Sequence, residues 1–448
     1  MSARLGHRPH HHKWHAELMR SVTTHQQAVA ALFAAPEAVS VPVTESLGRV
    51  TAVDVLAPIS LPGFDNSAMD GFAVRAADVA AATAENPVTL PVAADIPAGR
   101  TDVPTLQPGT AHRIMTGAPL PAGADAVVPV EHTRADFSAD AAPADTVTIT
   151  VPSAPQRNIR PAGSDIHAGA LALPAGTEID AAQIGVLCAL GLTDVAVWRA
   201  LRVAVLSTGS ELVAPGTPLL PGQIHESNGA MLTAACTAAG ADARHLHFVP
   251  DDPAQFLARL DAISAEADLI ITSGGVSAGA FEVVKESLSG ITDTAGHSNS
   301  RPAVEFVKVA MQPGMPQGCG HYRAPDGRAV PIVTLPGNPV SSLVSFEVFI
   351  RDPLRAAMGL CDGRRRLRAR LLSDITSPPG KRQFQRGVFV PAPDNGPEAR
   401  DGDVWITPVG PPASHHLSNL ARAEALVDIG ADVTALSRGD EVDVIALR

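Results

Sequence analysis

The chain has 448 residues and a formal net charge of −12, because 46 acidic residues outnumber 34 Lys and Arg. This length indicates about three domains, and a composition of 45% hydrophobic and 18% charged residues excludes a mainly disordered chain. The negative charge and the single tyrosine argue against a nucleic-acid-binding surface. No apolar run approaches the ~18–20 residues that span a bilayer, and the N-terminal segment lacks the apolar core of a signal peptide. We therefore expect a cytoplasmic protein with neither a membrane nor a nucleic acid as partner.

The N-terminal part predicts a small helical domain that is interrupted by a β domain. Residues 1–20 are expected to form a disordered, histidine-containing tail. A helix is predicted over Thr24–Ala35, because Thr24 and Gln27 have capping-box spacing. Segments 21–56 and 152–200 would together form a discontinuous helical and linker domain, in which a second helix, Ala181–Ala189, packs against the first. Residues 57–151 carry short β-prone runs broken by Gly and Pro, which indicates an inserted β domain.

Residues 201–362 predict an α/β domain with a parallel sheet. Apolar strands are expected at RVAVLSTG, HLHFV, DLIITSGG and PIVTLPG, and helices at Ser227–Gly240, Pro253–Ala265 and Pro339–Phe349. Strands that alternate with helices form a parallel sheet covered on both faces, and ligands bind such sheets at the carboxyl ends of the strands. Residues 363–448, from RRRLRAR to EVDVIAL, are expected to form a C-terminal β-barrel-like or sandwich-like domain. The fold class is thus multidomain α/β plus β.

Four segments rich in small residues occur in the α/β region and are expected at equivalent ends of its successive strands: LSTGSE (206–211), TSGGVSAG (272–279), QPGMP (312–316) and LPGNPVSS (335–342). Small residues let the backbone approach a ligand, and successive N–H groups can form a nest for a phosphate. In the last segment Asn338 is expected to cap a helix that begins at Pro339 and offers its N-terminus to an anion. Any one segment could be only a tight connection. All four in one domain indicate an anion-binding site, and no Walker A, GxGxxG or kinase motif competes with it.

Two loops of the β domain also contain candidate functional residues. The loop PGFDNSAMDGFA (62–73) holds Ser67 and Asp70 beside a glycine, and Asp65 and Asp70 are candidates for an oxyanion or metal-linked role. A second loop, IMTGAPLP, holds Thr116 before a glycine. Simple turns would explain both loops equally well.

Seven segments occur together in the order of a known family: FDNSAMDGFAV, RIMTGAPLPAGADAVVPVE, IRPAGSDIHAG, LSTGSEL, GQIHESNGAML, DLIITSGGVSAG and LPGNPVSS. From about residue 24 to the C-terminus the chain resembles the molybdopterin molybdenumtransferases (molybdenum insertases), relatives of the E domain of gephyrin. The resemblance implies a four-domain homodimer with composite active sites. Such an enzyme would insert molybdate into adenylylated molybdopterin with release of AMP, assisted by Mg²⁺. Molybdopterin adenylyltransferase and molybdoenzymes are then candidate partners.

The resemblance also implies roles for individual residues. Those in catalytic positions are Asp70, Thr116, Asp165, Glu211 and Lys308. Those in positions that bind the pterin substrate or molybdate are Ser67, Ser207, Gly209, Ser273, Gly274, Gly275, Ser277, Gly279, Pro336, Gly337, Asn338 and Pro339. Acidic positions for a metal are Glu211, Asp251 and Glu282, and carboxylates beside phosphates suit Mg²⁺.

The chain departs from the family pattern in three places. Glu282 stands in Gly-Ala-Phe-Glu-Val, where members often have Gly-Glu-Ala-Asp-Tyr. Gln312 and Met315 replace common lysines, so anion affinity would be weaker, or anion binding would be shared with arginine or the backbone. The connection Ile291–Val304 is longer than usual and is expected to be a surface loop rather than a lid. Two other functions stay open: a molybdopterin adenylyltransferase, which resembles the α/β part alone, and a non-enzymatic scaffold on the same fold.

Overall fold

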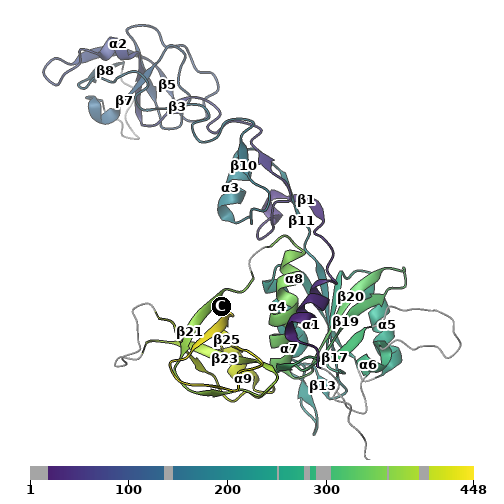
Figure 1. Cartoon of the computed structure of the whole chain (residues 1–448). Coiled ribbons are helices and arrows are strands. Elements are labelled where there is room, and N and C mark those ends of the chain that lie inside the picture. Colours follow the sequence, from purple (N-terminus) through teal and green to yellow (C-terminus); the bar gives the residue numbers. More distant parts are fainter. Residues whose placement is uncertain are drawn as a thin grey trace, which may run out of the picture. The chain divides into compact units, whose positions relative to one another are not determined.

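The computed structural model describes residues 19–135, 145–249, 252–276, 283–288, 304–360, 363–392 and 403–448 (Figure 1). These residues form two compact units: Val39–Val197, and the described residues on either side of that segment. None of the helices within the described ranges combines the length and the apolar character that crossing a bilayer requires.

The unit Val39–Val197 contains a five-stranded sheet in the order β7-β4-β6-β5-β8. Its strands are β4 (Gly71–Val74), β5 (Val88–Ile96), β6 (Ala111–Ile114), β7 (Ala126–Pro129) and β8 (Thr146–Ile149). Buried aliphatic side chains of this sheet and of the short helix α2 (Ala76–Val79) form one core. The sheet agrees with the β domain that the broken β-prone runs predict.

The rest of this unit is built from short strand pairs and one helix. Strand β1 (Ala38–Pro42) pairs with β11 (Asp194–Trp198), β2 (Val55–Leu56) with β10 (Leu171–Leu173), and β3 (Asn66–Ser67) with β9 (Ile159–Arg160). Helix α3 (Ala181–Ala189) has the predicted bounds, and Asp180 and Gln183 form its capping box. It packs with β1, β11 and the 3₁₀ turn Val43–Glu45 around buried Leu187 and Ile179.

Helix α1 (Val22–Ala30) differs from the prediction in both its start and its packing. Its N-cap is Ser21, whose hydroxyl accepts a hydrogen bond from the backbone N–H of Thr24 at 3.1 Å. The predicted cap at Thr24 is therefore wrong. The predicted packing against Ala181–Ala189 is wrong as well, because α1 packs on the α/β domain, where the His25 ring meets the edge of Phe349 with centroids 4.7 Å apart.

The α/β domain has a six-stranded sheet in the order β15-β12-β16-β20-β19-β17. The four strands β12 (Arg202–Thr208), β15 (Asp242–Val249), β16 (Leu269–Ser273) and β20 (Ala329–Leu335) are parallel, as predicted. The strands β17 (Glu305–Lys308) and β19 (Pro316–Arg323) extend the sheet in antiparallel fashion. The four strands predicted as parallel are thus confirmed, and β17 and β19 are additional strands that were not predicted. They run antiparallel because the connection between them is too short for a crossover helix.

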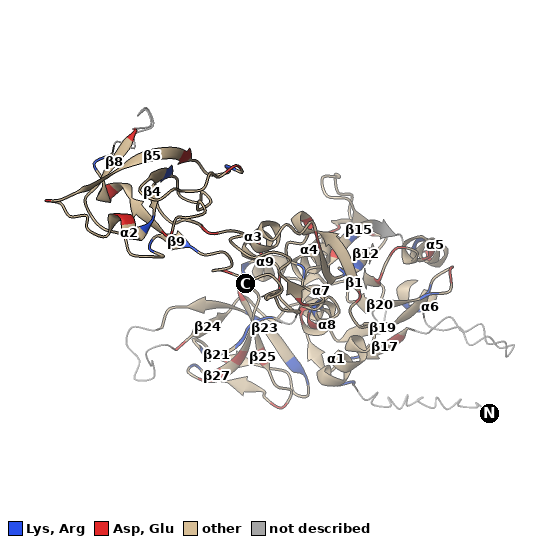
Figure 2. Ribbon diagram, turned by 90° about the horizontal axis from the view of Figure 1, so that it is seen from above, with Lys and Arg blue, Asp and Glu red and all other residues tan. Residues whose placement is uncertain are grey.

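Helices cover both faces of this sheet (Figure 1, Figure 2). One face carries α4 (Asn228–Ala238), α7 (Pro339–Ser345), α8 (Arg351–Ala356) and α1, and the other carries α5 (Pro253–Ser264) and α6 (Val283–Leu288). The helix predicted at Pro339–Phe349 is correct at its start, but it passes through a π-helical turn, Phe346–Ile350, and continues as α8. A short parallel pair, β13 (Leu212–Val213) and β14 (Ile224–His225), follows β12.

The C-terminal domain is a closed five-stranded barrel, which makes the β-barrel-like prediction correct. Strands follow in the order β23-β24-β21-β27-β25, and β25 pairs back to β23. The strands are β21 (Arg366–Leu371), β23 (Arg382–Val390), β24 (Trp405–Pro408), β25 (Ala425–Ile429) and β27 (Glu441–Ala446), with β22 (Ile375–Thr376), helix α9 (Leu417–Arg422) and β26 (Ala435–Leu436) between them. Strand β18 (Met311–Gln312) of the α/β domain pairs in parallel with β23. This pairing joins the barrel to the α/β domain.

Candidate active site

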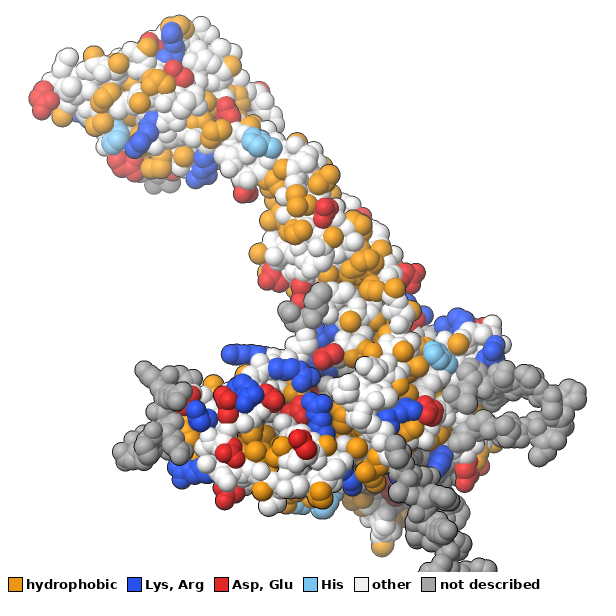
Figure 3. All heavy atoms as spheres, in the orientation of Figure 1, with side chains coloured by type: hydrophobic (Ala, Val, Ile, Leu, Met, Phe, Trp, Pro, Cys, Tyr) orange, Lys and Arg blue, Asp and Glu red, His pale blue; other side chains and the backbone are white. Residues whose placement is uncertain are grey.

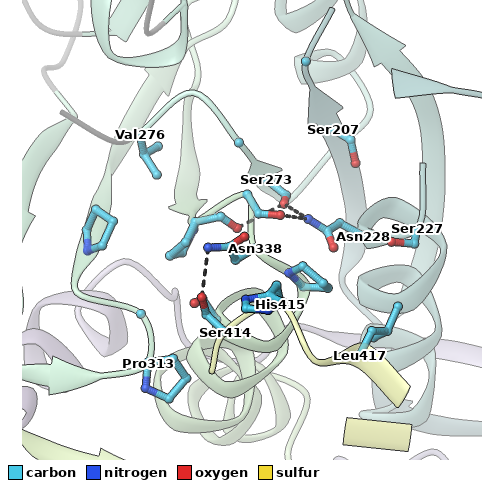
Figure 4. Close-up of a pocket in the computed structure, with 18 of the residues that line it drawn as sticks. Ser207, Ser227, Asn228, Ser273, Val276, Pro313, Asn338, Ser414, His415 and Leu417 are labelled. Carbon is cyan, nitrogen blue, oxygen red and sulfur yellow. Dashed lines mark hydrogen bonds between the residues drawn. The ribbon is translucent and has the colours of Figure 1, made fainter. Parts of the chain in front are cut away.

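A cavity of about 1090 Å³ lies at the carboxyl ends of β12, β16 and β20 (Figure 4). Its wall is formed by the loops after these strands, the start of α4, the QPGMP segment and residues 412–417 of the C-terminal domain. All of these elements belong to one compact unit. The cavity thus occurs where ligands bind in open α/β sheets. Residues that the sequence predicted for a site and that line the cavity are Ser207, Gly209, Glu211, Ser273, Gly274, Gly275, Pro336, Gly337, Asn338 and Pro339.

Two consecutive glycines allow the loops after β12, β16 and β20 to come together. Gly274 has φ +99°, and a Cβ there would lie 2.4 Å from the carbonyl oxygen of Thr208. Gly275 has φ +64°, and its Cβ would lie 2.8 Å from Val284 Cγ2. The N–H of Gly274 donates to the Leu335 carbonyl at 3.1 Å. Both positions require glycine, for their positive φ and for the close approach.

A buried carboxylate organises the base of the cavity. Glu226 is only 4% exposed, and its Oε1 accepts hydrogen bonds from the Ser207 hydroxyl at 2.8 Å and from the Gly229 N–H at 2.6 Å. Its Oε2 lies 3.6 Å from His245 Nε2. The hydroxyl hydrogen of Ser207 therefore points to Glu226, and Ser207 can meet a ligand only as an acceptor.

The loops after β16 and β20 are tied to the start of α4. The Asn228 amide donates to Ser273 Oγ at 2.7 Å and to the Gly337 carbonyl at 2.7 Å. Ser273 Oγ lies 3.1 Å from Ser342 Oγ, and the Ser342 hydroxyl donates to the Pro336 carbonyl. Figure 4 shows the Asn228 and Ser273 side chains pointing toward each other at one side of the cavity. The network fixes the LPGNPVSS turn against TSGG, so both loops form one rigid wall.

Asn338 does not cap α7 in the predicted way. It occupies the N-cap position, but its side chain makes no capping hydrogen bond, and its amide donates instead to Ser414 Oγ at 3.0 Å. The N–H of Val340 donates to the Ser414 carbonyl at 3.2 Å, while Pro339 has no N–H. The predicted side-chain cap is therefore wrong. The Asn338 amide and the Val340 N–H, at the start of α7, both donate to Ser414 of the C-terminal domain.

The contribution of the C-terminal domain to the cavity was not predicted from the sequence. Lys381, Ser414 and His415 line it, and they come from the turn before β23 and the loop before α9. Buried Arg386 holds that loop, because its guanidinium donates to the carbonyl of Ala413 at 2.9 Å and to the carbonyl of Pro411. Desolvation lowers the pKa of Arg386. The one sequence feature that could have indicated this part of the cavity is Lys381, which follows Pro-Pro-Gly in a chain with only four lysines.

Other predicted residues lie away from this cavity or outside the described residues. Lys308 ends β17 on the surface and is not among the lining residues; its carbonyl accepts from the Arg20 N–H at 2.8 Å. The predicted residues Asp251, Ser277, Gly279 and Glu282, and residues 291–303 of the long connection, lie outside the described residues.

Three of the family-like segments meet in the unit Val39–Val197. Strand β3 of FDNSAMDGFAV pairs with β9 of IRPAGSDIHAG, and the Ser67 carbonyl accepts from the Gly117 N–H at 2.8 Å. Ser67 is buried, and its hydroxyl donates to the Met69 carbonyl at 2.5 Å. Ser67 thus shapes the loop rather than facing solvent. Asp165 is exposed, with its N–H bonded to the Leu61 carbonyl at 3.0 Å.

Asp70 and Thr116 are in direct contact within that unit. Oδ1 of Asp70 accepts from the backbone N–H of Thr116 at 2.7 Å and from its hydroxyl at 2.8 Å. These two bonds, the backbone one foremost, lower the pKa of Asp70. An ionised carboxylate, exposed and held in one orientation, can act as a base or as a fixed negative charge.

The residues at the cavity suit Mg²⁺ only in part. Among the described residues no group of three or more His, Cys, Asp and Glu could hold a metal ion. Glu211 is exposed and lines the cavity, whereas Oε1 of Glu226 already accepts two hydrogen bonds. Mg²⁺ commonly takes one or two carboxylates together with substrate phosphates and water, and Glu211 fits that mode.

Comparisons with known proteins cover nearly all of the chain. The family model described as MoeA N-terminal region (domain I and II) matches residues 20–191, that of a probable molybdopterin binding domain matches 204–356, and that of the MoeA C-terminal region (domain IV) matches 368–447. The described residues that line the cavity all fall within the second and third of these regions.

Curated relatives and a solved structure agree with these matches. Molybdopterin molybdenumtransferase 2 of Mycobacterium tuberculosis is 53% identical over 427 residues, covering 95% of this chain and 99% of that protein. The molybdopterin molybdenumtransferase of a Nostoc species is 36% identical over 402 residues, covering 89% of this chain and 86% of that protein. The molybdopterin biosynthesis MoeA protein of Pyrococcus horikosii has a TM-score of 0.74 at 29% identity, covering 96% of this chain and all of that one. The sequence resemblance is therefore confirmed, and the chain belongs to the MoeA family of molybdopterin molybdenumtransferases, transferases of molybdenum cofactor biosynthesis.

Proposed function

We propose that this protein inserts molybdate into adenylylated molybdopterin and releases AMP in a reaction that needs Mg²⁺. The observation that carries the proposal is the cavity at the carboxyl ends of β12, β16 and β20, in the region that matches the molybdopterin-binding family model. Its volume of about 1090 Å³ is slightly larger than that of ordinary ligand pockets. That volume suits a pterin nucleotide together with a small oxyanion.

The cavity residues support binding of an anionic ligand. The backbone N–H of Gly275 and wall hydroxyl groups other than that of Ser207, which donates to Glu226, can bind phosphoryl or molybdate oxygens. Bound Mg²⁺ would neutralise charge that develops on the phosphoryl oxygens. Glu211 would hold that ion, and Glu226, through its hydrogen bonds to Ser207 and the Gly229 N–H, would keep the cavity floor in place.

We further propose that the active site is composite in a homodimer. Asp70 and Thr116 belong to one compact unit of the chain and Glu211 to the other. The unit Val39–Val197 exposes apolar side chains that a second copy could cover: the paired residues Leu56 and Leu171 are 56% and 50% exposed. Figure 3 shows hydrophobic side chains gathered over the region of β10 and α3. The substrate would be delivered by a molybdopterin adenylyltransferase and the product passed to molybdoenzymes; a cytoplasmic location stays a prediction.

Analysis of the products distinguishes this function from the two alternatives. Purified protein with adenylylated molybdopterin and Mg²⁺ should release AMP only when molybdate is added. Consumption of ATP with free molybdopterin would identify an adenylyltransferase instead, and no turnover with either substrate set would identify a scaffold. The β-domain loops, with Asp70 held by Thr116, favour the insertase, because the adenylyltransferases resemble the α/β part alone.

A further inference from the structure

Strand pairing places an arginine next to Asp70. Arg113 lies on β6, the central strand of the five-stranded sheet, and its antiparallel partner on β4 is Phe72. Asp70 directly precedes β4, and the Val130 N–H donates to its carbonyl at 3.0 Å, which continues the pairing with β7 as far as Asp70. Side chains two residues apart on a strand share a face. Arg113 is therefore the diagonal neighbour of Asp70, at a spacing that a long side chain can bridge.

The guanidinium group of Arg113 is largely removed from solvent. Its side chain is 13% exposed, and Nη1 lies 4.0 Å from Oδ2 of Asp95, its parallel neighbour on β5. A long ion pair to a carboxylate that is 39% exposed compensates a buried charge only weakly. A charge withdrawn from water is costly unless acids nearby compensate it. The position of Arg113 therefore favours an effect on a second carboxylate.

The charge of Arg113 acts on Asp70. The two hydrogen bonds from Thr116, the backbone one foremost, lower the pKa of Asp70, and the positive charge of Arg113 lowers it further. Thr116 bonds only to Oδ1, whereas a charge acts on the whole carboxylate. The other ionisable side chains on the elements around this end of the sheet are Asp65 before β3, Asp95 and Arg100 on and after β5, His112 on β6 and Glu131 after β7. Among the described residues, Arg113 is the charged group that lowers the pKa of Asp70.

We propose that Arg113 is a positioning residue for Asp70, whose carboxylate it keeps ionised and in place while a polyanionic substrate occupies the site. The inference rests on the proposed function, because phosphate and molybdate charges beside Asp70 would favour its protonated form. Asp70 is exposed and Arg113 is not, so the positive charge lies behind the carboxylate and offsets the substrate's charge. Arg113 acts through Asp70 and needs no contact with the substrate.

The first measurement is an NMR titration of the Asp70 side-chain carboxyl carbon in the full chain without ligand. Arg113→Gln removes the charge and should move the Asp70 midpoint to higher pH, and Arg113→Lys should restore most of the shift. Arg113→Met is a second neutral variant that keeps a long apolar stem. Arg134→Gln is the matched control and should leave the midpoint unchanged, because that exposed arginine donates at 3.4 Å to the Ala84 carbonyl.

The second measurement is the pH dependence of AMP release from adenylylated molybdopterin with molybdate and Mg²⁺. On the acid side of the profile, kcat of Arg113→Gln should fall about threefold to tenfold, as expected for one charge acting across a partly solvated gap. Its acid limb should lie at higher pH than that of the wild type. KM for the adenylylated pterin should change little, because Arg113 does not touch it, and Arg113→Lys should restore the profile.

Two results would overturn the proposal. One is an unshifted Asp70 midpoint in a neutral variant of Arg113 that melts at the wild-type temperature. The other is a loss of kcat that is equal at every pH, because a purely structural role leaves the acid limb in place. The titration needs no turnover. A midpoint that shifts in Arg113→Gln and returns in Arg113→Lys, in a protein that releases no AMP, would support the action of Arg113 on Asp70 and refute only the proposed function.

Discussion

Asp70 is held in one orientation by two hydrogen bonds from Thr116. One of its oxygens takes both donors of Thr116, 46 positions away in the sequence. We expect Asp70→Asn to lower the rate of AMP release by at least about 100-fold, the lower range for loss of a catalytic acid or base. Thr116→Val keeps the backbone bond and should lose less. The control Asp78→Asn removes a carboxylate that accepts the Gly109 N–H at 2.8 Å and should leave the rate unchanged. Full activity of Asp70→Asn would show that its charge is not used.

At the residue scale, the sequence predicted ten of the residues that line the cavity, but not what their side chains contact. The motifs located Asp70, Thr116 and Glu211 because their loops are rich in small residues and carry little apolar content. The role of Ser67 as a buried loop-shaping hydroxyl, and the bond between Ser207 and Glu226, depend on side-chain directions that spacing does not specify. Lys381 was missed because β18, which pairs with the strand that follows Lys381, lies about 70 residues earlier in the chain, and local sequence pattern does not show such long-range pairing.

Among the elements, the turn before α7 depends on its bond to the C-terminal domain. Asn338→Leu breaks the bond to Ser414, and Ser414→Ala breaks the same bond from the other side. Each should lower the free energy of unfolding by only about 0.5–1.5 kcal/mol, the usual range for one neutral hydrogen bond, and both should weaken molybdate binding. The double variant should lose no more than either single one. Additive losses in molybdate affinity would mean that the two residues act separately.

The start of β16 gives a pH-dependent prediction. Asp268 has a side chain 13% exposed, and burial alone would raise its pKa. The hydrogen bonds from Arg202 and Arg199 outweigh burial and lower the pKa from the ordinary 3.8 to about 2. Because the pKa of Asp268 is lower in the folded state than in the unfolded state, its ionised carboxylate stabilises the fold. This stabilisation is complete above about pH 4 and is lost as the pH falls towards 2.

Asp268→Asn should therefore lower the free energy of unfolding at pH 7 by about 2 kcal/mol. Urea unfolding of both proteins at pH 7 and at pH 3 measures this, and the difference between them should shrink at pH 3. Asp326→Asn is the matched control, because the Asp326–Arg328 pair is on the surface and contributes little. A difference that stays the same at both pH values would show that Asp268 acts through packing rather than charge.

Element prediction succeeded where local pattern and tertiary context agree. Helix α3 has the predicted bounds because Asp180 and Gln183 cap it. The antiparallel pair of β17 and β19 was not predicted. The sequence pattern of a strand does not show whether it runs parallel or antiparallel to its neighbour. Helix α1 was placed with the wrong partner, since an amphipathic pattern shows that one face is buried but not against what.

For the whole molecule, the composite site gives a complementation test. Asp70→Ala and Glu211→Ala should each be nearly inactive. In a heterodimer of the two variants, one composite site carries both lesions and the other carries none, by the two-fold symmetry of the interface. After subunit exchange, the heterodimer should recover up to about half of the wild-type activity. A heterodimer as inactive as its parents would show that both residues act within one chain.

The most direct test of insertion is the stoichiometry of a single turnover. Wild-type protein is mixed with adenylylated molybdopterin, Mg²⁺ and limiting molybdate, and AMP and cofactor-bound molybdenum are quantified in the same sample. The proposed reaction requires equal amounts of AMP released and molybdenum inserted, with neither formed when molybdate is omitted. AMP release that does not depend on molybdate, or insertion without loss of AMP, would contradict it.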